Sequence, residues 1–302
     1  MRQIYKGKIT WIDITAPDEE DINYLQKNYR FHPLILQELK TLTQRNKAEV
    51  YDNYLFLVTH FPAWDITKQT SQPWELDIIL SPKVLVTVSY NEISEAHLEL
   101  KEKVYQKNFD KEYLTDTFQL LYFIIEYYLD FAMRQIAHIQ EKLDAIEEQI
   151  FSHRQQEVIP ALSYVKRDIL NFRRIFQYLK EDLLSLARRG PRLFGENSRI
   201  YFEDLIGDSL RVDNVIENFK DTIESLENTN NSLMEHKINV LTRIYTIISF
   251  VTWPTLLVIS SYQMNTSYLP FIGYHYDFFI VLLMAFLPSI LIYFYLKKRH
   301  LL

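Results

Sequence analysis

The chain has 302 residues and a formal net charge of -6, a mildly acidic balance that argues against a nucleic-acid-binding protein. It has no cysteine, which excludes disulfide and thiol chemistry, and its 5 glycines leave no glycine-rich loop for phosphate binding. Its histidines and carboxylates form no spaced metal-ligand cluster and no Ser-His-Asp pattern, so we do not expect an enzyme.

The first segment, residues 1–115, alternates strand-like and helix-like stretches. Pro17 followed by several acids is typical of a helix start. Runs rich in β-branched and aromatic residues predict strands at residues 8–14, 54–61, 76–80 and 84–90. We therefore expect a small α/β domain, which the flanking charges discussed below place in the cytoplasm.

Residues 116–197 have the pattern of an antiparallel helical hairpin. Apolar residues follow alternating three- and four-residue steps over residues 136–150 and again over residues 158–186, which predicts two coiled-coil seams. The apolar run at residues 118–133 is interrupted by Glu126 and Asp130, so we interpret it as a buried helix of a soluble domain.

A third helix is predicted from Ser198 onward, because the chain meets no proline before Pro254. We assign residues 198–243 to a stalk that continues directly into a membrane span. Its predicted heptad seam consists of Val212, Val215, Phe219, Thr222, Leu226, Thr229, Leu233 and Val240. Such a helix cannot bury its seam alone, so we expect it to pack against the hairpin and against copies of itself.

The last segment, residues 244–302, contains two uncharged stretches at residues 244–262 and 278–296. Each has 19 residues, close to the ~20 that a membrane-spanning helix needs. Basic residues precede the first stretch and follow the second, whereas the connecting segment has none. The positive-inside rule then places both termini in the cytoplasm and the short loop outside. The fold class is thus α+β: a cytoplasmic α/β domain, a long helical stalk and a two-helix transmembrane hairpin with a basic tail.

A line of mostly polar side chains runs along the first span. Its members are spaced by four and three residues: Thr242, Thr246, Ser249, Trp253, Leu256, Ser260 and Gln263. A polar stripe on a membrane helix faces other helices or water more often than lipid. It indicates either helix packing or a pore, and a pore requires a symmetric ring because one span per subunit cannot enclose a channel.

The end of the first span carries the most specific motif, Tyr262-Gln263-Met264-Asn265. Together with Pro254, Asn239, the "YFEDL" start of the stalk, the "HPLILQEL" and "KVLVTVSY" stretches and the basic end, it resembles the CorA family of magnesium channels. That family has Tyr-Gly-Met-Asn at this place, so Gln263 departs from its pattern.

The resemblance implies a homopentamer in the cell membrane, with five first spans around one pore for divalent cations. Magnesium is then both the transported ion and a regulator inside the cell, with cobalt or nickel as further passengers. The implied selectivity filter consists of Gln263, Met264 and Asn265. The implied pore-lining residues are Asn239, Thr242, Tyr245, Thr246, Ser249, Trp253, Leu256 and Ser260. Asp204 is implied to bind regulatory magnesium between subunits, with Glu75 or Asp77 as its possible partner.

Two alternatives remain open from the sequence. A zinc or other divalent-cation transporter with proton coupling would use His275 and Asp277 as the first candidates for the proton. A non-conducting pentameric scaffold or sensor is favoured by Trp253 and Gln263, which add bulk where the family has smaller residues.

Overall fold

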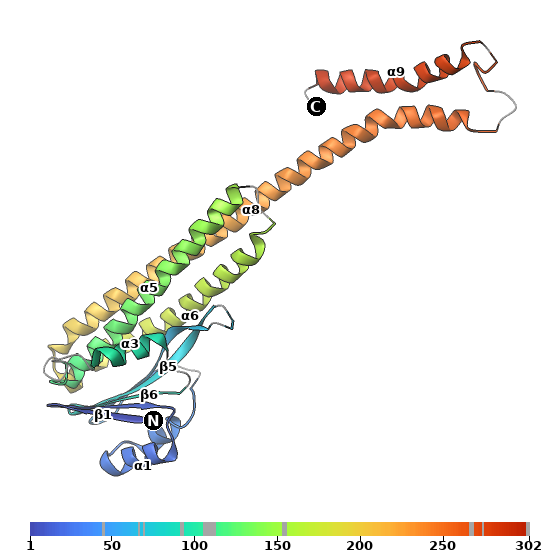
Figure 1. Cartoon of the computed structure of the whole chain (residues 1–302). Helices are drawn as coiled ribbons and strands as arrows, with labels where there is room; N and C mark the ends of the chain where they lie inside the picture. Colours follow the sequence, from blue (N-terminus) through green and yellow to red (C-terminus); the bar gives the residue numbers. More distant parts are fainter. Residues whose placement is uncertain are drawn as a thin grey trace. The chain divides into compact units, whose positions relative to one another are not determined.

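The computed structural model (Figure 1) describes residues 1–43, 46–65, 67–68, 70–90, 94–104, 113–152, 156–265, 269–273 and 275–299. The chain divides into two compact units, Met1–Glu227 and Asn228–Leu302, here called the N-terminal and C-terminal units. The predicted segments 1–115, 116–197, 198–243 and 244–302 stay predictions of domain organisation.

The elements of the N-terminal unit are β1 (Arg2–Lys6), β2 (Thr10–Thr15), α1 (Glu19–Asn28), α2 (Pro33–Glu38), β3 (Lys47–Val50), β4 (Leu55–Asp65), β5 (Thr70–Leu80), β6 (Val84–Ser89), α3 (Glu95–Val104), α5 (Thr117–Phe151), α6 (Ile159–Arg189) and α7 (Pro191–Phe194). α8 (Ser198–Tyr262) begins in this unit and continues in the C-terminal unit, which also holds α9 (Asp277–Lys298).

One sheet of six strands, in the order β1-β2-β6-β5-β4-β3, organises the described part of the N-terminal unit. Only β2 and β6 pair in parallel, and the other neighbours are antiparallel. One sheet face packs against α1 and α2 through residues such as Ile14, Phe56 and Leu25. In Figure 1, α3, α5 and α6 lie on the opposite side of the sheet from α1. The predicted α+β class is confirmed.

The four predicted strands correspond to β2, β4, β5 and β6, whereas β1 and β3 were not predicted. β1 and β3 are the edge strands, and most of their side chains are only half-buried, so their sequences lack a clear apolar alternation. The helix predicted after Pro17 is α1, which begins after Asp18. The Asp18 carboxylate accepts the Asp21 backbone N–H at 2.8 Å, and Asp21 returns a bond to the Asp18 backbone, which forms a capping box.

The apolar residues of the two predicted seams are buried, as expected, although α6 packs against β4 and β5 as well as against α5. Ile136, Leu143 and Ile150 of α5 are buried, as are Val165, Phe172 and the other predicted seam residues of α6. The first part of α5 is a buried helix as predicted, and the Tyr128 ring stacks on Phe61 of β4 with centroids 4.5 Å apart. This contact fixes the hairpin to the sheet.

α8 packs on the hairpin within the N-terminal unit, as expected, but its predicted seam is partly wrong. Val212, Phe219 and Leu226 are buried. Thr222 is exposed and Val215 is half-buried, because Ile216 and Ile223 occupy the inward positions. Three ion pairs join α6 and α8 beside this seam: Lys166–Glu227, Arg173–Glu217 and Lys180–Asp213.

The C-terminal unit contains two helices long and apolar enough to cross a membrane, the end of α8 and α9. They pack together where α9 has small residues one turn apart, Ala285 and Ser289, both buried. The Thr255 hydroxyl of α8 lies 3.0 Å from the Ala285 carbonyl oxygen and 2.8 Å from the Ser289 hydroxyl. These polar contacts are satisfied within the pair, which suits a water-free environment.

Candidate ion pathway and metal site

The predicted polar stripe lies on the side of α8 that α9 leaves uncovered. Every member of the stripe is exposed, and so are the other two predicted pore-lining residues, Asn239 and Tyr245. The half-buried residues of the first span are Ile247, Val251, Pro254, Thr255, Val258 and Tyr262. Each residue turns the helix by about 100°, so the exposed stripe and the half-buried residues point in opposite mean directions around the helix axis, about 180° apart. The stripe is therefore free to face water or another subunit.

Two stripe hydroxyls are held by the helix itself. The Thr246 hydroxyl donates to the Thr242 carbonyl oxygen at 2.8 Å, and the Ser249 hydroxyl donates to the Tyr245 carbonyl oxygen at 2.9 Å. A hydroxyl that donates its only hydrogen in this way presents oxygen lone pairs to its surroundings. The waters around a hydrated cation point their hydrogens outward, so such oxygens are suitable acceptors for them.

The motif at the end of the first span continues the helical hydrogen bonding. The Gln263 N–H approaches the carbonyl oxygens of Ile259 at 3.1 Å and Ser260 at 3.2 Å. Among the described residues, the non-glycine residues with positive φ are Ala16 and Phe271, so Gln263 replaces the family's glycine without that strain. Met264 and Asn265 follow and are exposed. The backbone thus leaves the side chains of all three predicted filter residues exposed at the end of the first span.

The segment that leads from the first span to α9 is held by hydrogen bonds of Asp277 and Tyr262. The Asp277 carboxylate accepts the backbone N–H of Phe278 at 2.6 Å and that of Gly273 at 3.4 Å. The Tyr262 hydroxyl donates to the Pro270 carbonyl oxygen at 2.9 Å. The Asp277 side chain is therefore engaged in holding the start of α9, and the His275 ring packs edge-on against Tyr276.

Asp204 lies in a group of acids on two adjacent helices of the N-terminal unit. The Tyr122 hydroxyl of α5 is 2.7 Å from Asp204 Oδ2 and 3.1 Å from Glu126 Oε1, and its single hydrogen serves one carboxylate at a time. Burial raises the pKa of Glu126, opposed by the Tyr122 hydrogen bond and reinforced by the carboxylates of Asp130, Asp204 and Asp208. Burial likewise raises the pKa of Asp208, with Asp204 and Asp130 adding to the effect.

Sequence reasoning missed the partners of Asp204 on α5. The signal was present, since Glu126 and Asp130 are the two acids that interrupt an apolar run. No group of three or more His, Cys, Asp or Glu residues in the described part of one chain has the geometry to hold a metal ion. Asp204 has an exposed carboxylate, a ligand type that divalent cations accept, and its role as a metal ligand stays a prediction.

Glu75 and Asp77 are unsuitable as partners of Asp204 in a neighbouring subunit. Glu75 is 4% exposed, and both of its carboxylate oxygens lie 2.8 Å from the Thr43 backbone nitrogen. Asp77 is 0% exposed and accepts a hydrogen bond from the Tyr90 hydroxyl at 2.5 Å. Burial, opposed by this hydrogen bond and reinforced by the Glu75 carboxylate, raises the pKa of Asp77 well above its ordinary value. Both acids belong to the interior of the sheet domain, which corrects the expectation from the sequence.

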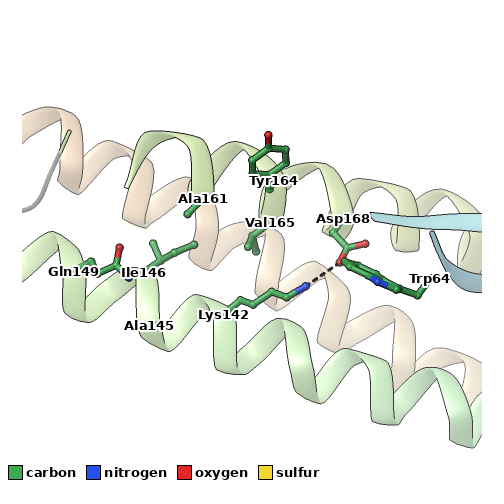
Figure 2. Close-up of a pocket in the computed structure, with 9 residues that line it drawn as sticks. All are labelled: Trp64, Lys142, Ala145, Ile146, Gln149, Ala161, Tyr164, Val165 and Asp168. Carbon is green, nitrogen blue, oxygen red and sulfur yellow. Dashed lines mark ion pairs between the residues drawn. The ribbon is translucent and has the colours of Figure 1, made fainter. Parts of the chain in front are cut away.

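A cavity of about 450 Å³ between α5, α6 and the end of β4 provides no cation site (Figure 2). Its walls are mostly apolar, with Ile146 and Val165 facing each other across the two helices. Its one carboxylate, Asp168, accepts the Ser71 N–H at 2.7 Å and lies 3.8 Å from the Lys142 ammonium. The same ammonium lies 4.5 Å from the centre of the Trp64 ring. The charge of Asp168 is therefore already compensated.

Comparisons with known proteins agree with the motifs and the fold. A family model described as "CorA-like Mg2+ transporter protein" matches residues 6–298. The cobalt/magnesium transport protein CorA of Thermotoga maritima is 25% identical over 292 residues, which cover 96% of this chain and 82% of that protein. The protein of the same name from Methanocaldococcus jannaschii is 21% identical over 97% of this chain and 90% of its own length. The complete structure of the CorA magnesium transporter from Methanocaldococcus jannaschii matches with a TM-score of 0.83 and 18% identity, covering 96% of this chain and 90% of that one. The chain therefore belongs to the CorA-like Mg2+ transporter family, which consists of membrane transporters and not of enzymes.

Proposed function

We propose that five copies of this chain form a ring in the cell membrane and admit divalent cations, magnesium foremost, with cobalt and nickel as further passengers. The first spans line the pore with Asn239, Thr242, Tyr245, Thr246, Ser249, Trp253, Leu256 and Ser260. Gln263, Met264 and Asn265 form the outer mouth. Both chain termini lie in the cytoplasm, as the basic flanks of the spans indicate.

The observation that carries this proposal is the uncovered polar stripe on α8. α9 packs on the opposite side of the helix, so none of the residues that the structure describes shields the stripe from lipid. Hydroxyl and amide groups facing hydrocarbon are unfavourable, whereas a ring of identical chains would turn all five stripes toward a shared water-filled path.

The chemistry of the mouth suits a hydrated magnesium ion. Magnesium releases its water reluctantly, so five neutral Asn265 amide oxygens would bind the ion through its water shell. Neutral oxygens hold the ion weakly enough to let it leave. The membrane potential provides about 4.6 kcal/mol for moving two charges across 100 mV, so inward transport needs no other energy source.

In this proposal, Asp204 lies at a boundary between subunits and regulates the opening of the ring by binding internal magnesium. Magnesium bound there would favour a closed ring, and its loss at low internal magnesium would loosen the packing of the cytoplasmic parts. An ion that binds one state better than the other shifts the equilibrium by that difference in affinity.

The test is ion flux into liposomes that contain the purified full-length protein and a magnesium-sensitive dye. With an imposed potential, wild type admits magnesium and Asn265→Ala loses most of the flux, because the ring of amide oxygens is removed. Asn53→Ala changes an exposed asparagine in the β3–β4 turn and serves as the control with unchanged flux.

Other outcomes would replace the proposal. Zinc flux without magnesium flux, changed by a pH gradient, would identify the proton-coupled alternative. No flux of either ion from a correctly assembled pentamer would favour the scaffold or sensor.

A further inference from the structure

An apolar groove runs along one edge of the helix pair in the C-terminal unit. It has a volume of about 640 Å³ and lies between Thr252 and Leu256 of α8 and Phe286, Ile290 and Tyr293 of α9. The Thr252 hydroxyl donates within its own helix, to the carbonyl oxygens of Ile248 at 2.9 Å or Ser249 at 3.3 Å. The groove therefore suits apolar side chains as its contents.

The other edge of α8 carries protruding apolar side chains. Phe250 is 61% exposed, and Leu257, two turns further along the same edge, is 49% exposed. At about 100° per residue, Phe250 and Leu257 lie on one side of the centre line of the polar stripe, and Thr252 and the stripe residue Leu256 lie on the other. When the protruding side chains of one copy enter the groove of the next copy, two different surfaces meet. Such a heterologous contact generates a closed ring when the rotation between copies closes.

The groove also borders the stripe itself, because Leu256 belongs to both. Any group that fills the groove lies beside the proposed pore and separates it from lipid. A lipid chain there would leave a gap between the stripes of neighbouring subunits, so the pore is incomplete unless protein seals this edge.

The two edges are level with each other in the membrane. Thr255 contacts Ala285 and Ser289, and the two helices run in opposite directions (Figure 1). Because the helices are antiparallel, residues that precede Thr255 by more than one turn on α8 lie at the same depth along the helix axis as residues that follow Ser289 on α9. This places Phe250 at the depth of Ile290 and Tyr293.

We infer that the groove between α8 and α9 receives Phe250 and Leu257 of a neighbouring copy of this chain, and that this knob-in-groove contact seals the pore. The inference rests on the proposed ring and specifies which surfaces meet within it.

Disulfide trapping tests the contact cleanly, because the natural chain has no cysteine. Two full-length variants with different affinity tags, Phe250→Cys and Ile290→Cys, are co-expressed in membranes and oxidised. A disulfide that joins the two tags must connect different chains. We expect this cross-linked species to be abundant.

The matched control replaces Ile290→Cys by Leu291→Cys. Leu291 is the next residue of α9, exposed at nearly the same depth, but about 100° around the helix and outside the groove. We expect at least a tenfold lower yield of the mixed disulfide with this variant. Equal yields, or a higher yield with Leu291→Cys, would overturn the contact.

A second measurement separates this inference from the proposed function. The same membranes are treated with a lysine-reactive cross-linker to count subunits, and flux is measured in parallel. A conducting pentamer without the Phe250–Ile290 disulfide would refute the groove contact and leave the channel in place. A monomer without flux would refute both.

Discussion

At the scale of single residues, Gln263 is the position where this chain departs most clearly from its family. Gln263 is the first residue after α8, its φ is not positive and its N–H is bonded to the preceding turn, so glycine's conformational freedom is not needed there. What the substitution changes is the side chain at the mouth beside Asn265. An added amide is neutral and polar, which is compatible with a hydrated cation.

Gln263→Gly should therefore alter the rate of magnesium flux but not create it. Glycine is well accommodated just past a helix end, so we also expect the melting temperature to stay close to that of wild type. Both are measured on the full-length protein, flux in liposomes and melting in detergent. If wild type does not conduct and Gln263→Gly does, the native mouth is blocked, and the scaffold alternative gains support.

At the scale of secondary structure elements, a partly buried series of polar contacts joins α6 to the sheet. The Asn46 amide beside β3 donates to the Asp182 carboxylate of α6 at 2.5 Å, and its oxygen lies 2.7 Å from His60 Nδ1 of β4. His60 Nε2 is 3.3 Å from the Glu75 carboxylate of β5. Burial raises the pKa of Asp182 to about 7, opposed by the Asn46 hydrogen bond and by His60, and reinforced by Glu181.

This raised pKa predicts that part of the stability is lost as the pH rises. The unfolded carboxyl ionises near its ordinary pKa of 3.8, whereas the folded one keeps its proton up to about 7. The stabilisation is therefore complete below about pH 4, declines through about pH 7 and stays lost above it.

Asp182→Asn removes the ionisation and keeps the shape of the protonated side chain. We expect the variant to melt close to wild type at about pH 4 and at a higher temperature at about pH 8, where its free energy of unfolding should exceed that of wild type by an amount on the order of a few kcal/mol. Asp144→Asn, at an exposed position of α5, should match wild type at both values. If the melting temperature of Asp182→Asn changes with pH in the same way as that of wild type, Asp182 does not control the pH dependence of stability.

Local sequence patterns predicted the elements well and their contacts poorly. The seams of α5 and α6 and the end of the first span at Tyr262 follow directly from periodicity and from the lack of charge. In α8 the spacing alone did not decide between Val215 and Ile216, because the choice depends on how the helix is rotated against the hairpin. The pairing of Asp204 with Tyr122 joins residues 82 positions apart, and no local pattern specifies such a contact.

At the scale of the whole molecule, the acids and the membrane spans occupy different units of one chain. The N-terminal unit holds Asp204 among like charges that help to raise the pKa values of Glu126 and Asp208, and in the proposed ring this part of the surface would attract a cation. The C-terminal unit holds the polar stripe, which in the proposed ring would line a pore together with the stripes of neighbouring copies. Both features are incomplete in a single chain, and oligomerisation would complete both.

Magnesium should therefore stabilise the assembled protein through Asp204. An ion that binds only the folded assembly adds about 2.7 kcal/mol at a hundredfold excess over its dissociation constant. We expect the melting temperature of full-length wild type in detergent to rise with magnesium, and the rise to be much smaller for Asp204→Asn. Glu203→Gln, which removes the neighbouring exposed acid on α8, controls for the loss of one negative charge and should keep the rise. An equal rise in wild type and Asp204→Asn would place the stabilising magnesium elsewhere, and gating would then have to be traced to a different part of the ring.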